Sequence, residues 1–176
     1  MMNYATIKKT DVANGLGIRV SLFVSGCTHY CKGCFNQEAW DFHYGHPYTE
    51  EVEAEILEAL APEYIRGISV LGGEPMEPKN RFTVLELLKK VKETYPTKDI
   101  WCYTGYDYEK DLLRWIQEGC TEVAELLEII DILVDGEFIE ERKNLRLRFR
   151  GSENQRIIDV KASLQQKKTV LAEEFL

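Results

Sequence analysis

Three cysteines within eight positions form the most reactive grouping in the sequence: Cys27, Cys31 and Cys34. Thiolates are preferred ligands of soft metal centres, so three of them this close can hold one centre. Spacing alone leaves two kinds of site open. Tetrahedral zinc needs a fourth ligand, which His29 or His43 could supply. A [4Fe–4S] cluster normally takes four thiolates, so three would leave one iron open, and an open metal position points to catalysis.

The remaining cysteines, Cys102 and Cys120, stand alone, and we expect them to be small, partly buried residues. A secreted disulfide scaffold usually shows an even and dispersed set of cysteines. Five cysteines with three of them clustered indicate a reducing compartment and a metal or redox site.

A second candidate is the turn Gly72-Gly73-Glu74-Pro75, which follows the apolar run 68–71. Two glycines allow the backbone to approach a ligand closely, and a carboxylate can pair with an ammonium group. Such a tetrapeptide by itself is more typical of a plain turn. In α/β proteins, however, ligands bind at the carboxyl ends of parallel strands, so we expect this turn on the same face as the cysteine loop.

The elements that must position both motifs follow from hydrophobic periodicity. Alternating or short apolar runs predict strands at 4–8, 18–24, 68–71, 100–104 and 132–134. Amphipathic spacing predicts helices from the N-cap Thr49 to Pro62, at 82–91, at 108–117 and at 123–130. The cysteine segment, about 26–46, is predicted to be a loop that follows the second strand. Alternation of this kind indicates βαβ units and a mainly parallel sheet.

The C-terminal part differs in style. Residues 145–149 alternate as a strand would, with a basic face of Arg146, Arg148 and Arg150, while 156–160 predicts a returning strand and Ser163 the cap of a final helix. That basic face is either solvated or a dock for an acidic partner surface. Four or five βα units are fewer than the eight of a closed barrel, which predicts a partial (β/α) barrel or an open sheet.

Composition narrows the function classes. The 176 residues suit a single domain, 1–176, and 22 basic against 30 acidic residues give a net charge of −8, which disfavours nucleic-acid binding. No apolar run approaches the roughly 20 residues that cross a bilayer, and the first residues lack the apolar core of a signal peptide. We therefore expect a cytoplasmic protein with no membrane partner.

Taken together, the motifs resemble a known family. A CxxxCxxC loop after the first parallel strand with GGEP after the second resembles the radical S-adenosylmethionine superfamily. The finer patterns at 26–36 (GCxHxCxGCxN), 134–138 (VDGxF) and 149–157 (FRGSxNQRI) are similar to the activating proteins of anaerobic (class III) ribonucleoside-triphosphate reductases. This similarity spreads from Gly15 to Asp159.

The resemblance implies a mechanism. The three cysteines would hold a [4Fe–4S] cluster whose fourth iron binds S-adenosylmethionine, and reductive cleavage would give a 5′-deoxyadenosyl radical. The target would be a glycine in the large subunit of the reductase, and the electron donor a flavodoxin-like protein. A folded protein segment as substrate requires an open active-site face, which a partial barrel offers.

The resemblance also implies cofactor contacts. Gly72, Gly73 and Glu74 would fix the methionine ammonium. The backbone around Gly33 and the ring of Phe35 would meet the adenine, because this chain has Gly33 where many superfamily members have an aromatic residue. Further candidates for the cofactor lie in the matched motifs or at strand ends: Asn36, Thr104, Asp135, Arg150 and Ser152.

Three other functions are compatible with part of these motifs: a radical enzyme acting on a small molecule, such as a deazapurine synthase, an activase of another glycyl radical enzyme, and a non-catalytic zinc-binding module. A zinc-binding module does not require a GGEP turn beside its cysteines. A small-molecule enzyme is not expected to carry the RGSxNQR segment. The sequence therefore favours the reductase activase, and gives His43 and His46 no role.

Overall fold

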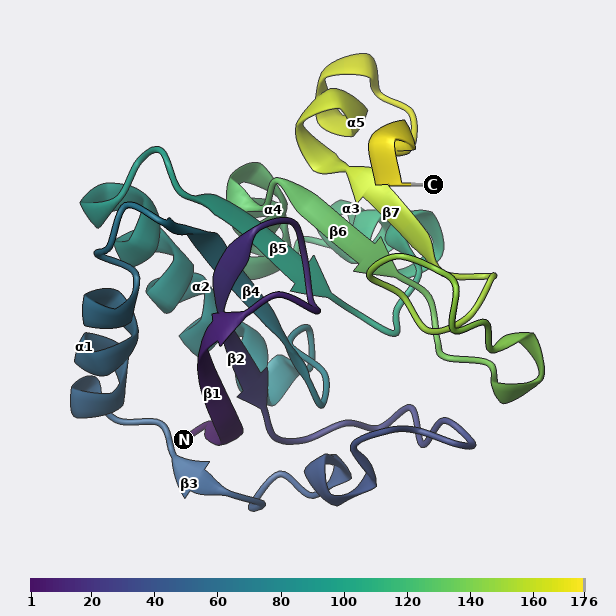
Figure 1. The fold of residues 1–176 in the computed structure, drawn as a ribbon. Coiled ribbons are helices and arrows are strands. Elements are labelled where there is room, and N and C mark those ends of the chain that lie inside the picture. The colour runs from purple at the N-terminus through teal and green to yellow at the C-terminus, as the bar shows by residue number, and fades with distance from the viewer. Residues whose placement is uncertain (176) are drawn as a thin grey trace.

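The fold is a mixed α/β structure, given by a computed structural model that describes residues 1–175 (Figure 1). One sheet has the strand order β3-β1-β2-β4-β5-β6-β7. The strands are β1 (Asn3–Asp11), β2 (Ile18–Val24), β3 (His46–Pro47), β4 (Ile65–Gly72), β5 (Asp99–Tyr103), β6 (Ile132–Asp135) and β7 (Arg156–Asp159). The central pairs β2–β4, β4–β5 and β5–β6 are parallel, as predicted, whereas β1, β3 and β7 join antiparallel at the flanks.

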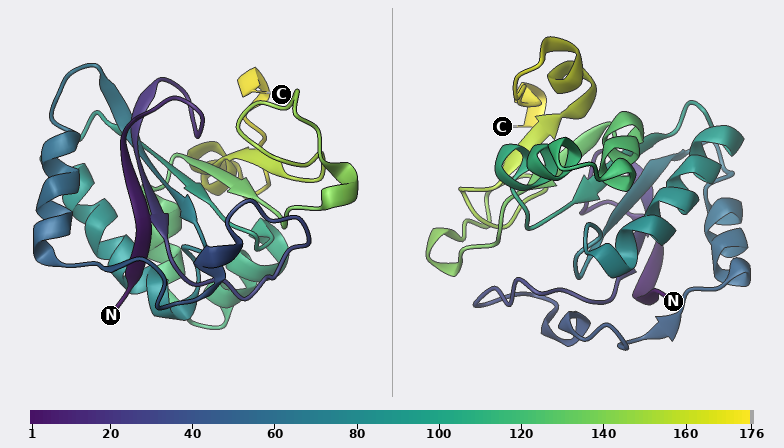
Figure 2. Two further views of the ribbon diagram at one scale, coloured as in Figure 1. Left: turned by 60° about the horizontal axis from the view of Figure 1, so that its bottom comes forward. Right: turned by 180° about the vertical axis from the view of Figure 1, so that it is seen from behind.

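Helices cover one face of this sheet (Figure 2). The α-helices are α1 (Glu50–Ala59), α2 (Pro78–Thr94), α3 (Arg114–Gln117), α4 (Thr121–Ile129) and α5 (Val160–Gln166). Alternate side chains of the strands, such as Leu22, Val70 and Cys102, pack with the helices into the main core. No helix within residues 1–175 is long and apolar enough to span a bilayer.

The opposite face of the sheet is buried as well. Trp101, Val134 and Ile157 pack there with Phe175 from the C-terminal segment. Segments from outside the sheet cover this face. Polar side chains on it, such as that of Arg19, are therefore fully buried. This covering layer ends near the carboxyl ends of the strands, where a cavity begins.

Arg19 organises the buried face at the other end of the sheet. Its guanidinium donates to the Ser69 hydroxyl at 2.8 Å and to the Leu16 and Ile68 carbonyls, and it pairs with Asp99 at 2.6 Å. Removing one partner of a buried pair is strongly destabilising, because the other charge stays without compensation.

We therefore expect Arg19→Met to lower the free energy of unfolding by about 3 kcal/mol in urea titrations. The same substitution at Arg66, which also pairs with Asp99 but is half exposed, serves as the control. It should change stability by less than about 1 kcal/mol. Equal effects of the two variants would contradict the role given to Arg19.

Residues 145–149 do not form the predicted strand. Phe149 adopts a positive φ of 59°, which a strand cannot contain, and the Leu147 amide donates back to the Asn144 carbonyl. The alternation of apolar and basic residues has another cause: Phe149 turns inward to pack on Trp101, with ring centroids 5.3 Å apart. The predicted basic strand face is thus wrong, and the segment is a loop.

Two helix details also differ from prediction. Asp159, not Ser163, caps α5, because its carboxylate accepts from the Ala162 amide at 3.0 Å and Ser163 lies inside the helix. The helix predicted at 108–117 begins as a π-helical segment, Tyr108–Leu113, before α3. The cap at Thr49 is confirmed, since its hydroxyl accepts from the Val52 amide.

Candidate functional site

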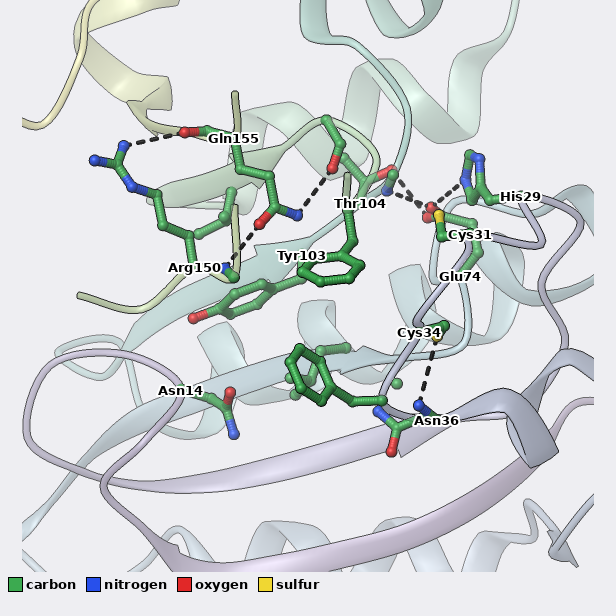
Figure 3. A pocket seen from close by; sticks show the side chains of 18 of the residues that line it. Asn14, His29, Cys31, Cys34, Asn36, Glu74, Tyr103, Thr104, Arg150 and Gln155 are labelled. Carbon is green, nitrogen blue, oxygen red and sulfur yellow. Dashed lines mark hydrogen bonds and ion pairs between the residues drawn. The ribbon is translucent and has the colours of Figure 1, made fainter. Parts of the chain in front are cut away.

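A cavity of about 480 Å³ opens where β2, β4, β5 and β6 end (Figure 3). Cavities of this size suit small-molecule ligands. It brings together most of the residues predicted for the site: Cys27, Cys31, Cys34, Phe35, Asn36, Gly72, Gly73, Glu74, Thr104 and Arg150. The cysteine loop and the GGEP turn therefore do share one face, as the strand order predicted.

Backbone hydrogen bonds join the two motifs directly. The Glu74 amide donates to the Gly26 carbonyl at 2.8 Å, and the Gly73 amide donates to the Val24 carbonyl at 2.8 Å. A Cβ at Gly73 would lie 2.7 Å from the Gly26 carbonyl oxygen, so only glycine permits this approach. The start of the cysteine loop is thereby fixed against the end of β4.

The three sulfurs are spread around the cavity rather than gathered at a point. Among residues 1–175, only Asp107, Glu109 and Asp135 bring three ligand atoms within 4.8 Å of one another. Three sulfurs about 2.3 Å from one zinc ion would lie closer than that. Thiolates that bind different irons of a cluster are farther apart, so the donor set fits a [4Fe–4S] cluster better than a zinc ion.

The cysteines need a cation to become ligands. Burial raises the pKa of Cys27 to about 12 and also raises the pKa of Cys31, while the nearby carboxylates of Glu74 and Glu137 add to these shifts. A thiolate in such surroundings requires a positive partner, which iron provides.

Glu74 is almost fully buried, and its carboxylate is already saturated (Figure 3). One oxygen accepts from the Gly105 amide at 2.7 Å and from His29 Nε2 at 2.8 Å. The other accepts from the Met76 amide at 2.8 Å and from the Thr104 hydroxyl at 2.9 Å. Four donors from three segments therefore meet on this one group.

His29 is held between two carboxylates. Its Nε2 bonds to Glu74, and its Nδ1 lies 3.0 Å from an oxygen of Glu137. Burial alone would lower the pKa of His29, but the bonds to Glu74 and Glu137 raise the pKa to about 9. The ring also meets Tyr106 edge-on at 4.4 Å. The sequence offers His29 only as a possible zinc ligand, whereas its neighbours in the fold give the ring a fixed place between two carboxylates.

A second buried carboxylate, that of Glu77, holds Thr28, the residue before His29. Glu77, just before α2, accepts from both the amide of Thr28 at 3.0 Å and its hydroxyl at 2.6 Å. The two residues that follow Cys27 are thus each gripped by a carboxylate of the segment after β4. The cysteine loop owes its position to these contacts as well as to its own turns.

Three predicted site residues are not among those that line the cavity. Asp135 accepts from the Tyr108 amide and pairs with Arg156 at 2.6 Å. Ser152 is fully buried, and its hydroxyl accepts from the Ile139 amide. Gly33, with a φ of 75°, lies where a Cβ would be 2.8 Å from the Glu140 carboxylate, so it permits close packing of the loop on 138–152.

Three polar groups of the cavity lining have no partner within residues 1–175: the Tyr103 hydroxyl, Arg150 Nε and Trp40 Nε1. Buried polar groups are normally hydrogen-bonded, so each points to a polar ligand. The match is chemical: a guanidinium suits a carboxylate, and a phenol suits a hydroxyl or carboxylate.

Sequence reasoning missed Tyr103 and Gln155. Tyr103 ends β5, and its position next to Thr104 was a usable signal. Gln155 sits in the RGSxNQR segment, and its side-chain oxygen accepts from the Gly151 and Ser152 amides while its nitrogen donates to the Gly136 carbonyl. This side chain holds the segment in place beside the cavity.

Comparison with known proteins agrees with this geometry. The sequence model of the family described as "4Fe-4S single cluster domain" matches residues 13–158. Three relatives share the name anaerobic ribonucleoside-triphosphate reductase-activating protein. The protein of Vibrio cholerae is 46% identical over 88% of this chain and 96% of its own length. That of Pasteurella multocida is 40% identical, over 88% and 95%, and that of Enterobacteria phage T4 is 38% identical, over 89% and 93%.

Proposed function

This chain belongs to the family of anaerobic ribonucleoside-triphosphate reductase-activating proteins, and from that premise we propose that it generates a glycyl radical on the large subunit of its reductase, using a [4Fe–4S] cluster and S-adenosylmethionine. One observation carries the proposal. The three cysteines and the Gly72-Gly73 turn line a single cavity whose Tyr103 and Arg150 have unpartnered polar atoms.

Each residue set has its own task in the proposal. Cys27, Cys31 and Cys34 hold the cluster. The backbone at Gly72 and Gly73 meets the methionine ammonium, since glycines have only carbonyls to offer it. Arg150 and Tyr103 meet the carboxylate or ribose, and Phe35, which lines the cavity, meets the adenine.

Glu74 supports this arrangement from behind. Its carboxylate has its lone pairs engaged by four protein donors, so it acts by fixing the turn, Thr104 and His29 rather than by binding the ammonium itself. Held in this way, the glycine backbone is preorganised for its ligand.

The chemistry is a one-electron cleavage followed by a hydrogen transfer. Cys27, Cys31 and Cys34 would hold the cluster, which would supply the one electron needed to cleave S-adenosylmethionine to methionine and a 5′-deoxyadenosyl radical; that radical would take the hydrogen atom of the glycine Cα–H and end as 5′-deoxyadenosine. The protein orients the reactants and keeps competing hydrogen donors away. A cytoplasmic reductant of the flavodoxin class would deliver the electron.

The architecture suits a protein substrate. We propose that 1–176 acts as one radical S-adenosylmethionine domain and that the curved sheet is the partial (β/α) barrel of that superfamily. Both edges of the sheet remain apart, since β3 and β7 stand at opposite ends of the strand order. An unclosed sheet leaves room beside the cavity for a segment of another protein.

One anaerobic EPR experiment tests the proposal. Iron-reconstituted protein is mixed with reductant, S-adenosylmethionine and the reductase large subunit, and a glycyl-radical doublet on the reductase is expected. A reduced-cluster signal without that doublet would move the function to another substrate. Absence of a cluster signal after sound reconstitution would favour a zinc site instead.

A further inference from the structure

A basic loop stands at the mouth of the cavity. Residues 142–150, with the sequence RKNLRLRFR, hold five cations and no acidic residue in a chain whose net charge is −8. None of the five forms an ion pair with a carboxylate within residues 1–175. Lys32 shows the contrast, because it pairs with Glu140 and Glu141, which directly precede the loop. The charges of the basic loop are thus uncompensated inside the protein.

Hydrogen bonds of backbone and amide groups shape the loop, and two of its guanidinium groups donate to backbone carbonyls, Arg148 to Glu174 at 3.4 Å and Arg150 to Gln155 at 3.0 Å, without meeting a carboxylate. The Asn144 amide donates to the Gly151 carbonyl, and the Arg146 amide donates to the Asn144 side chain. At its base, Gln155 accepts from Gly151 as described above, and Phe149 packs on Trp101 and on Phe175, 5.7 Å away. The RGSxNQR segment therefore anchors the base of a preordered loop. Preordered surfaces lose less conformational entropy when they bind a partner.

Apolar side chains lie among the cations. Leu145 is 85% exposed and Phe35 is 64% exposed, yet both line the cavity that would hold the cofactor. The Lys143 ammonium lies 5.0 Å from the centroid of the Phe35 ring. Exposed apolar groups framed by polar ones are typical of a binding surface rather than of bare solvent contact.

We propose that the basic loop docks an acidic segment of the reductase, with an apolar side chain of that segment seated on Leu145, so that the target glycine enters the cavity. This inference rests on the proposed function and names the surface and the chemistry of its protein partner. Charge complementarity carries it: unpaired cations surround an apolar centre beside the cavity in which the proposed chemistry takes place. Such charges chiefly raise the rate of encounter and fix the register.

The test is charge reversal at two positions that do not line the cavity. Arg142 and Arg146 are exposed, and neither side chain makes a hydrogen bond within residues 1–175. The double variant Arg142→Glu/Arg146→Glu should weaken binding of the reductase large subunit about tenfold or more at low salt. Its affinity should also depend less on salt, and the yield of glycyl radical at limiting reductase should fall in proportion.

The matched control is Lys167→Glu/Lys168→Glu, which makes the same change in net charge at exposed positions after α5, away from the cavity lining. Its affinity for the reductase should stay near that of the unaltered protein. Cleavage of S-adenosylmethionine without reductase should be unchanged in both variants. Equal affinities of the two variants, or loss of that uncoupled cleavage in the first, would overturn the docking proposal. If the unaltered protein itself binds the reductase but yields no radical, the failure lies with the proposed function instead.

Discussion

Serine at Cys27, Cys31 or Cys34 is expected to abolish both the reduced-cluster EPR signal and cleavage of S-adenosylmethionine. The cavity offers three sulfurs and no fourth, so each loss removes the sole protein ligand of one iron. A serine hydroxyl is far harder to ionise than a thiol and makes a poor ligand for a soft centre. Iron content, the EPR spectrum and product methionine are measured on protein reconstituted under identical conditions.

Cys120→Ser is the matched control for this series. Cys120 precedes α4, does not line the cavity, and its thiol donates to the Glu122 carboxylate at 3.5 Å, a bond that serine can replace. Its iron content and cleavage rate should match those of the unaltered protein. Full cleavage by any one of the three cavity variants would contradict the cluster assignment.

Glu74→Gln is expected to loosen the cysteine loop, with the free energy of unfolding lowered by about 3 kcal/mol. The amide cannot accept from all four donors that meet on the carboxylate, so two of them lose their partner in a buried place. In the apoprotein, amide hydrogen exchange over residues 27–36 should speed up markedly, and iron retention after reconstitution should fall.

Glu38→Gln makes the same chemical change at an exposed position of the same loop and should leave exchange and iron content unaltered. The outcome separates two roles for Glu74. A carboxylate that only binds the ammonium would, when changed, weaken S-adenosylmethionine binding while exchange and iron content stayed constant. That pattern would refute the positioning role.

Most strands of the fold could be predicted from the sequence because each buried strand is short, apolar and bounded by turn residues. The two motifs were also placed correctly on one face, since parallel strands present their carboxyl ends together. The segment 145–149 failed because its alternation looks like a strand, whereas the positive φ of Phe149 is set by packing against Trp101. Periodicity carries no information about such a distant contact.

The details of the site were less accessible. The donors to Glu74 come from positions 29, 76, 104 and 105, and nothing in their local sequence says that they converge. Asp135 was predicted to contact the cofactor, but it does not line the cavity. It ends a strand on the predicted face, but Arg156 from the neighbouring β7 engages its carboxylate. Cross-strand partners of this kind become visible only when the sheet order is known.

The attachment of Gly26, Thr28 and His29 to the segment after β4 consists of hydrogen bonds that contain no metal. In small zinc domains the apo chain unfolds, because metal binding supplies the folding free energy. Here the hydrogen bonds that position the cysteine loop involve no iron, so we expect the loop to keep its place when iron is lost. The iron-free polypeptide is therefore expected to take up a cluster again under anaerobic conditions without first having to refold.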